Sequence, residues 1–108
     1  MTSTTDVLGS LGRFSEPALL ILISLADGPK HGYAMTQDIE ALSGQKLGPG
    51  TLYGAIARLE ERAWIQALPA DDRRRPYKLT TAGRAVLRAR LETMHAMTRV
   101  GRSRLADA

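Results

Sequence analysis

The run from Pro17 to Ala26 constrains the fold more than any other segment, because Ser24 is its only polar residue. The preceding Ser15-Glu16-Pro17 is typical of a helix start, with a capping side chain and then proline in the first turn. The following Asp27-Gly28-Pro29 would end that helix. A membrane-spanning helix needs about 20 apolar residues, so this shorter run predicts a helix buried in the middle of a soluble protein.

Two more helices are expected after this run. The first begins near His31-Gly32-Tyr33 and ends at Ser43-Gly44, and its inner stripe is Met35, Ile39 and Leu42. The second begins at Gly48-Pro49-Gly50-Thr51, because proline pre-sets the first helical turn, and it runs to about Ala63.

Helical spacing divides the second of these helices into two faces. The apolar face carries Leu52, Ile56, Leu59 and Ala63. The opposite face carries Thr51, Ala55, Arg58 and Arg62. A helix with one apolar side and one side of small and guanidinium-bearing residues is suited to a DNA groove.

A hairpin and a long helix complete the predicted order. The segments 64–69 and 75–80 have the alternation of two short strands around a polar loop at 70–74, with core-facing Ile65, Ala67, Tyr77 and Leu79. Thr80 or Thr81 would cap a last helix from about Ala82 to Arg102 or beyond.

This order of elements predicts a mainly α fold with a small two-stranded β-wing, that is, a winged helix-turn-helix followed by a long C-terminal dimerisation helix. The 108 residues fit one compact unit. We expect an N-terminal arm or short helix at 1–14, a winged helix-turn-helix DNA-binding domain at 15–80, and a C-terminal dimerisation helix and tail at 81–108.

The charge of the chain is unevenly placed. Residues 1–72 carry a net charge of −4 and residues 73–108 a net charge of +8, which together give the overall +4. Such asymmetry suggests a polyanionic partner. A solvated helix face with a basic tail is the alternative explanation of the same charges.

Catalytic and metal-binding patterns are missing from the sequence. There is no cysteine, which excludes disulfides and thiolate sites and suits a cytoplasmic protein. His31 and His95 lie far apart, and no Ser-His-Asp arrangement or phosphate-binding loop is visible. We therefore expect no enzyme, no cofactor, no metal and no membrane segment, and we expect His31 to cap or pack at a helix start.

Four segments at fixed spacing resemble the PadR-like transcriptional regulators. They are His31-Gly32-Tyr33, Gly48-Pro49-Gly50-Thr51-Leu52-Tyr53, Arg58-Leu59-Glu60-Glu61, and the run from Arg73 to Arg84, Arg-Arg-Arg-Pro-Tyr-Lys-Leu-Thr-Thr-Ala-Gly-Arg. The resemblance covers about Ala18 to Leu91. It implies a dimeric bacterial repressor with a winged helix domain, often relieved by a small molecule, and this chain resembles the short subgroup that lacks a large C-terminal domain.

The sequence departs from this family at two points. Many members carry serine or asparagine where Gly48 stands, so no side-chain contact is expected there. Some short members stack a planar drug on an aromatic residue of the last helix, and this helix has no aromatic residue.

The candidate DNA-binding residues lie in the second and third helices and the wing: Tyr33, Pro49, Gly50, Thr51, Tyr53, Arg58, Arg62, Arg73, Arg74, Arg75 and Lys78. Glycines and a helix start allow close approach of a phosphate, while arginines bind phosphate or base edges. The bland alternatives are a core position for Tyr53, a surface ion pair between Arg58 and Glu61, and a solvated hairpin tip.

The candidate dimer interface combines the N-terminal arm with the last helix: Leu8, Leu11, Phe14, Leu87, Leu91, Met94, Met97 and Val100. The last helix has more apolar length than a three-helix domain can cover, and a twofold dimer is the commonest partner for such a helix. The alternative is a helix folded back on its own core.

These observations favour a sequence-specific DNA-binding transcriptional regulator, a dimeric repressor that binds a pseudo-palindromic operator and responds to a small-molecule effector. The rival interpretation is a winged-helix protein-interaction module that does not bind DNA. Salt distinguishes the two, because only phosphate binding weakens steeply with ionic strength.

Overall fold

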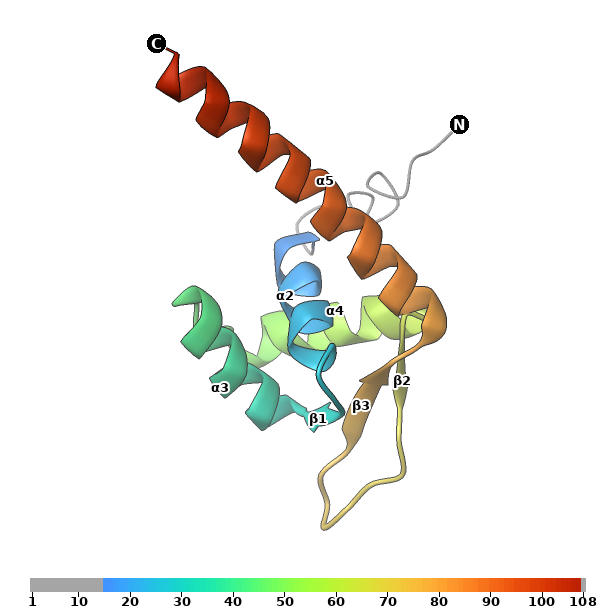
Figure 1. Cartoon of the computed structure of the whole chain (residues 1–108). Helices are drawn as coiled ribbons and strands as arrows, with labels where there is room; N and C mark the ends of the chain where they lie inside the picture. Colours follow the sequence, from blue (N-terminus) through green and yellow to red (C-terminus); the bar gives the residue numbers. More distant parts are fainter. Residues whose placement is uncertain (1–14, 108) are drawn as a thin grey trace.

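The computed structural model describes residues 15–107 (Figure 1). Its elements in order are α2 (Ser15–Leu25), β1 (Lys30–His31), α3 (Gly32–Ser43), α4 (Pro49–Glu61), β2 (Ile65–Ala67), β3 (Pro76–Leu79) and α5 (Thr81–Ala106). This is the winged helix-turn-helix with a long last helix that the sequence predicts. The predicted short helix and arm at 1–14 lie outside the described residues.

Helix α2 is the centre of the core, as its apolar run predicts. Ala18, Ile21 and Leu22 are fully buried, and α2 contacts α3, α4, α5 and β3. Figure 1 shows α2 enclosed by the other helices, with the sheet at one end. The core cluster also takes in Met35 and Ile39 of α3, Leu52, Ile56 and Leu59 of α4, and Val86 and Leu87 of α5.

Three side chains depart from the predicted core pattern. Leu42, predicted to be internal, is 46% exposed, because it lies in the last turn of α3 beyond the residues that the core covers. Ala55, predicted on the outer face of α4, is fully buried. Each helical residue rotates by about 100°, so Ala55 lies only about 40° around the helix from buried Leu59, four residues later. Ala63 is exposed, because α4 ends at Glu61 and Ala63 takes a left-handed backbone angle, φ 60°.

The sheet has three strands rather than the predicted two. Its order is β1-β3-β2, and both pairings are antiparallel. Lys30 pairs with Tyr77 and His31 with Pro76, so the entry to α3 is hydrogen-bonded to the wing. A strand of two residues carries no readable alternation, which is why the sequence pattern does not reveal it.

The wing ends in a tight turn. Asp71 and Arg74 exchange backbone hydrogen bonds of 2.7 and 2.8 Å, and the two residues between them have positive φ, 47° for Asp72 and 67° for Arg73. Positive φ at both central positions is the type I′ geometry that suits hairpins and favours asparagine and glycine. Arginine in this position therefore adds backbone strain.

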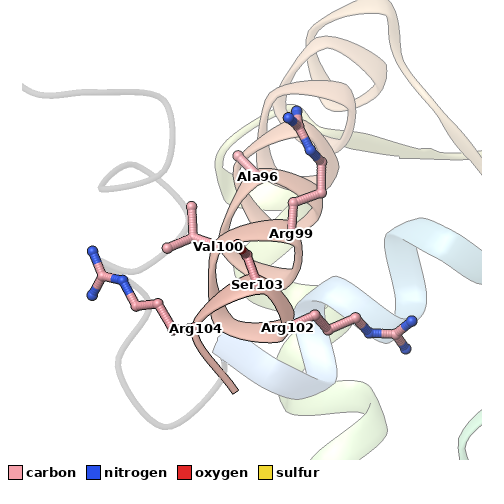
Figure 2. Close-up of a pocket in the computed structure, with 6 residues that line it drawn as sticks. All are labelled: Ala96, Arg99, Val100, Arg102, Ser103 and Arg104. Atoms are coloured by element: carbon pink, nitrogen blue, oxygen red, sulfur yellow. The ribbon is translucent and has the colours of Figure 1, made fainter. Parts of the chain in front are cut away.

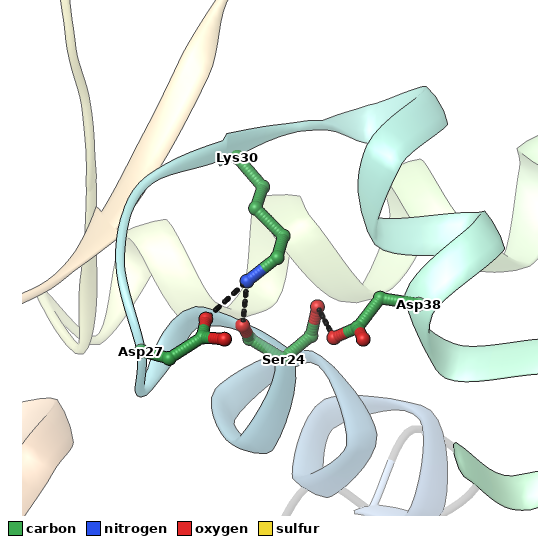
Figure 3. Close-up of polar contacts among 4 residues, drawn as sticks. All are labelled: Ser24, Asp27, Lys30 and Asp38. Carbon is green, nitrogen blue, oxygen red and sulfur yellow. Dashed lines mark hydrogen bonds and ion pairs between the residues drawn. The ribbon is translucent and has the colours of Figure 1, made fainter. Parts of the chain in front are cut away.

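A polar cluster fastens α2 to the strand and helix that follow it (Figure 3). The buried hydroxyl of Ser24 donates to Oδ2 of Asp38 at 2.7 Å, which joins α2 to α3. The ammonium of Lys30 donates to the carbonyl of Ser24 and to the carboxylate of Asp27. Lys30 thereby lowers the pKa of Asp27 through a hydrogen bond and charge attraction. The one polar residue of the apolar run is thus satisfied.

Helix α5 begins at a close junction with the end of α4. The hydroxyl of Thr80 accepts from the amide of Gly83 at 3.0 Å and donates to the carbonyl of Ala63 at 2.6 Å. The amide of Thr80 donates to the carbonyl of Trp64 at 3.1 Å. Gly83 lies directly against that carbonyl, where a Cβ atom would overlap the oxygen. Thr80 is therefore the helix cap, and glycine is required three residues later.

This junction predicts a large destabilisation for Gly83→Ala. Alanine normally stabilises a helix interior by about 1 kcal/mol relative to glycine, but here its methyl group would force α5 away from Trp64. We expect a net loss of about 2 kcal/mol or more in the free energy of unfolding, measured by urea denaturation.

The matched control is Gly101→Ala in the same helix, where a Cβ atom meets nothing. It should be neutral or stabilising by up to about 1 kcal/mol. Similar free energies of unfolding for Gly83→Ala and Gly101→Ala would contradict the close contact between Gly83 and the carbonyl of Trp64.

Candidate nucleic-acid interface

The first turns of α4 form an exposed platform. Gly48 precedes the helix with no side-chain cap, and Pro49 occupies its first turn. Pro49, Gly50 and Thr51 are all exposed. Tyr53 is 52% exposed, so it is not the core aromatic that the alternative interpretation required. This end of α4 offers hydroxyl groups and little steric bulk.

The first turn of α3 lies beside this platform. Its cap is His31, whose Nδ1 accepts from the amide of Ala34 at 3.4 Å, as the sequence led us to expect for a residue at a helix start. Tyr33 is 66% exposed, and its hydroxyl accepts from the side-chain amide nitrogen Nε2 of Gln37 at 3.2 Å. Gly32 is buried, and a Cβ atom there would come within 2.5 Å of the Tyr53 hydroxyl. Glycine therefore allows the Tyr53 hydroxyl to lie against the first turn of α3.

The wing brings its three arginines to the same place. Arg73, Arg74 and Arg75 are all exposed. A guanidinium nitrogen of Arg75 donates to the carbonyl of Leu68 across the hairpin at 3.2 Å. A guanidinium nitrogen of Arg74 lies 3.5 Å from Nε2 of His31. The β1–β3 pairing accounts for this approach, since it places His31 beside the residues that follow the wing tip.

Two small cavities mark where these elements meet. The first, about 290 Å³, lies between the wing and the starts of α3 and α4, and its lining comprises His31, Gly32, Tyr33, Tyr53, Arg73, Arg74, Arg75 and Tyr77. The second, also about 290 Å³, lies between α3 and α4 and includes Lys46 and Pro49. The structure thus gathers Tyr33, Tyr53 and the three wing arginines into one surface, which we call the α3–α4–wing surface.

Burial changes the pKa of one side chain at this surface, Tyr77. Desolvation raises the pKa of the Tyr77 phenol, and the neighbouring carboxylate of Glu60 raises it further. Tyr77 therefore remains a neutral hydroxyl at physiological pH. The charged groups of the lining are the three arginines, so the cavity presents positive charge and hydrogen-bond donors.

Six of the predicted DNA-binding residues lie outside the first cavity: Pro49, Gly50 and Thr51 at the start of α4, and the three cations Arg58, Arg62 and Lys78. Arg58 is exposed on α4 and lies 3.6 Å from the carboxylate of Glu61, the ion pair that the alternative interpretation proposed. Arg62 follows the last turn of α4, about 20 Å from Pro49, and its guanidinium lies 5.5 Å from the centre of the Trp64 ring. Lys78 is exposed on the face of β3 opposite to buried Tyr77.

Two residues of this surface were not among the predicted binding residues. Lys46 belongs to the loop before α4, where no periodic pattern assigns a direction to a side chain. His31 was expected to cap or pack, and its second nitrogen faces the wing only because β1 pairs with β3. Both assignments depend on tertiary contacts that spacing alone does not reveal.

Helix α5 leaves the core after its first turns (Figure 1). Leu87 is buried in the core of its own subunit. The residues that follow at every third position are exposed, with fractions of 42% for Leu91, 36% for Met94, 57% for Met97 and 50% for Val100. We call these four the α5 apolar stripe. Leu8, Leu11 and Phe14, expected to join them, lie outside the described residues.

Three further hollows lie along α5, and the two of larger volume differ in what closes them. One of about 410 Å³ has an apolar floor of Ala26, Leu87 and Leu91, with Arg84, Arg88, Glu92 and His95 around it. The other, about 620 Å³, is lined by residues of α5 alone, so no second described element closes it. Figure 2 shows Arg99, Arg102 and Arg104 extending outward from these last turns.

Metal and membrane sites are not found in the described part of the chain. Residues 15–107 contain no group of three or more potential metal ligands. No helix among them is long and apolar enough to cross a membrane.

Comparison with known proteins supports the same fold and family. A sequence model of the transcriptional regulator PadR-like family matches residues 21–89. An uncharacterized 37.1 kDa protein in transposon TN4556 of Streptomyces fradiae is 48% identical over 82 residues, which cover 76% of this chain and 24% of that protein. Transcriptional regulator Rv3488 of Mycobacterium tuberculosis is 39% identical over 72 residues, 64% of this chain and 66% of that protein. This chain thus spans less than two thirds of either relative.

Solved structures share the fold at lower identity. A PadR family transcription regulator from hypervirulent Clostridium difficile R20291 has a TM-score of 0.74 at 24% identity, over 82% of this chain and 96% of that one. A transcriptional regulator from Clostridium thermocellum has a TM-score of 0.70 at 24% identity, over 95% and 97% of the two chains. The family match covers more than half of the sequence and extends from the central helix through the wing into α5, and the chain therefore belongs to the PadR-like family of transcriptional regulators.

Proposed function

We propose that this chain is a sequence-specific DNA-binding transcriptional repressor that acts as a homodimer. The observation that carries the proposal is the α3–α4–wing surface, where three exposed arginines and two exposed tyrosines line one cavity. Exposed side chains of this kind bind phosphate and base edges. The DNA-binding unit would be residues 15–80, and the dimerisation unit would be the helix that begins at residue 81.

The proposed DNA complex follows from the exposed face of α4. Its first half, with Pro49, Gly50, Thr51 and Tyr53, would enter the major groove, since the first three of these residues are exposed and small. Arg58 would reach a base edge deeper along the same helix. The wing arginines and Lys78 would bind the flanking backbone, which fixes the register of α4 without reading sequence.

Arg62 is the weakest of the proposed DNA contacts. Its position at the far end of α4 and its stacking on Trp64 give it a structural role at the base of the wing. Cation–π contacts of this kind contribute roughly 0.5–1 kcal/mol at exposed sites. This makes Arg62 a useful reference for the other arginines of the helix.

The proposed dimer is held by the α5 apolar stripe. Four exposed apolar side chains at every third position place an apolar surface in water that winds around α5 by about 60° at each step. A second α5 across a twofold axis would cover it, and the two winged domains would then address two half-sites of a pseudo-palindromic operator. The predicted contribution of Leu8, Leu11 and Phe14 remains a part of this proposal.

Repression relieved by a small molecule is the regulatory part of the proposal. A dimer bound over a promoter excludes other proteins from the same DNA. An effector that binds along α5 would change the separation of the two α4 helices, and Met94 and Met97 provide adaptable side chains for it. A reporter gene under the promoter beside the chain's own gene tests this part, since deletion of the chain should raise expression.

The wing predicts a specific salt dependence. Each phosphate contact adds about −0.9 to the slope of log K against log salt. If two of Arg73, Arg74 and Arg75 bind phosphate in each subunit, changing all three to alanine should flatten the slope by roughly 3–4 in the dimer. The measurement is a salt titration by fluorescence anisotropy on one duplex.

The control removes the same charge elsewhere. Changing Arg99, Arg102 and Arg104 to alanine takes three guanidinium groups from the end of α5, far along the chain from the wing (Figure 2). This variant should keep a slope within about one unit of the wild type. Parallel lines for the wild type and the wing variant would favour the protein-interaction module instead.

Arg58 predicts a loss of specificity. A bidentate contact to a base edge provides about 1–3 kcal/mol of discrimination, whereas its exposed pair with Glu61 is worth little. Arg58→Ala should therefore weaken binding to the operator while leaving binding to a random duplex nearly unchanged. Arg62→Ala is the control and should leave the ratio of the two affinities unaltered. Equal weakening of Arg58→Ala on both duplexes would make Arg58 a backbone contact.

Leu91 predicts the oligomeric state. Leu91→Asp places a charge in the α5 apolar stripe and should convert a dimer into a monomer at micromolar concentration, measured by sedimentation velocity. Ala85→Asp adds the same charge at an exposed position outside the stripe and should leave the dimer intact. A wild-type protein that sediments as a monomer would refute the dimer.

A further inference from the structure

We propose that the imidazole of His31, together with Arg74, Tyr33 and Tyr53, forms an oxyanion site that holds one phosphodiester group of the DNA backbone. This inference rests on the proposed function, and it assigns a phosphate-binding role to a residue that sequence reasoning assigned to capping or packing. The group would lie in the cavity of about 290 Å³ between the wing and the starts of α3 and α4.

The first argument is that no proton arrangement of His31 satisfies both of its neighbours. Nδ1 accepts from the amide of Ala34 at 3.4 Å, so the neutral ring carries its proton on Nε2. Nε2 then faces a guanidinium nitrogen of Arg74 at 3.5 Å, and arginine is always a donor. In the opposite tautomer, Nδ1–H faces the N–H donor of Ala34 instead. In the imidazolium form, both ring N–H groups face donors.

An oxygen acceptor at this point resolves the conflict. One oxyanion oxygen accepts from His31 Nε2–H and from Arg74 together, while Nδ1 continues to cap α3. Charge-assisted bonds of this kind are about twice as strong as those between neutral groups. The position of Arg74 beside His31 therefore indicates a place for an anion between or beside the two donors.

The rest of the cavity is built from compatible groups. Among the described residues, none of those that line it is acidic. Arg73 and Arg75 add two more guanidinium groups, and Tyr33 and Tyr53 add hydroxyls that can donate. Tyr77 contributes a phenol that burial keeps protonated. An anion in this cavity would meet donors on several sides, and the neighbouring carboxylate of Glu60 is not part of the lining.

Gly32 shows how closely the cavity wall is fitted. A Cβ atom at this position would come within 2.5 Å of the Tyr53 hydroxyl and within 3.4 Å of Leu52. Any side chain there would move the hydroxyl of Tyr53 away from the first turn of α3. The glycine thus keeps a donor from α4 next to the donors from α3 and the wing.

The location favours a phosphodiester over a free phosphate ion. The cavity is shared by both elements that the proposed function places on DNA, the start of α4 and the wing. A backbone phosphate bound here would lie between a base-reading helix and the flanking contacts. A free phosphate ion has the same chemistry, so the experiment includes it as a separate arm.

The first test separates phosphate binding by His31 from its capping role. Asparagine is among the best helix caps, yet its shorter side chain does not reach toward Arg74 as the imidazole does. His31→Asn should unfold at nearly the same urea concentration as the wild type while its affinity for a random-sequence duplex falls by about tenfold or more.

The control for this variant is His95→Asn, which changes the chain's other histidine in the exposed part of α5. It should alter neither stability nor affinity. A His31→Asn protein that binds the duplex as tightly as the wild type, with wild-type binding still steeply salt-dependent, would overturn the site and leave the proposed function intact.

The second test uses the wild-type chain and does not depend on a variant folding. The imidazole signals of His31 in a ¹H–¹⁵N correlation spectrum should shift when the random duplex is added, while those of His95 stay in place. Nε2 should remain the protonated nitrogen. Shifts with the duplex but not with millimolar inorganic phosphate support the phosphodiester as the ligand.

The remaining outcomes also decide the matter. A shift of the His31 imidazole signals with millimolar inorganic phosphate would show a site for free anions. That result would overturn the assignment to the DNA backbone. Duplex binding without any shift of His31 would overturn the site alone. A chain that does not bind any duplex would refute the proposed function, and the inference would fall with it.

Discussion

The junction around Thr80, where Gly83 lies against the carbonyl of Trp64, joins the start of α5 to the end of α4. At this point α4 has just ended, β2 is about to begin, β3 has ended and α5 starts. Thr80 connects three of these segments, since it bonds to Ala63 and Trp64 and caps α5 through Gly83. The start of α5 is therefore fixed by these hydrogen bonds together with the burial of Val86 and Leu87 in the core.

A second constraint acts at the other end of the sheet. The two residues of β1 pair with β3, and they lie directly before α3. This pairing fixes the start of α3 against the wing, while Lys30 and Ser24 fasten the same segment to α2. The side chains of the α3–α4–wing surface thus project from elements that are each attached to the core. A surface built in this way needs little ordering when it binds, which limits the entropic cost of association.

The sequence predicts the elements of this fold much better than the relations between them. The apolar run at 17–26, the Gly-Pro-Gly start of α4 and the threonine cap of α5 are local signals, and the structure confirms each. The third strand is missed because two residues are too short for a pattern, and Ala55 is misplaced because a small residue at the edge of a helix face suits either side. The position of His31 against Arg74 depends on that unseen strand.

The distribution of strain supports the assignment of the α3–α4–wing surface to a polyanion. In the core, helix propensity, capping and burial agree with one another, as they do in most folded proteins. At the wing, Arg73 holds a left-handed conformation at φ 67° that glycine or asparagine would adopt more easily. Three neighbouring guanidinium groups repel one another, and one of them faces a donor of His31. Strained or frustrated positions persist where function requires them. A row of phosphates would relieve the repulsion and the opposed donors together, whereas an apolar protein surface would relieve neither.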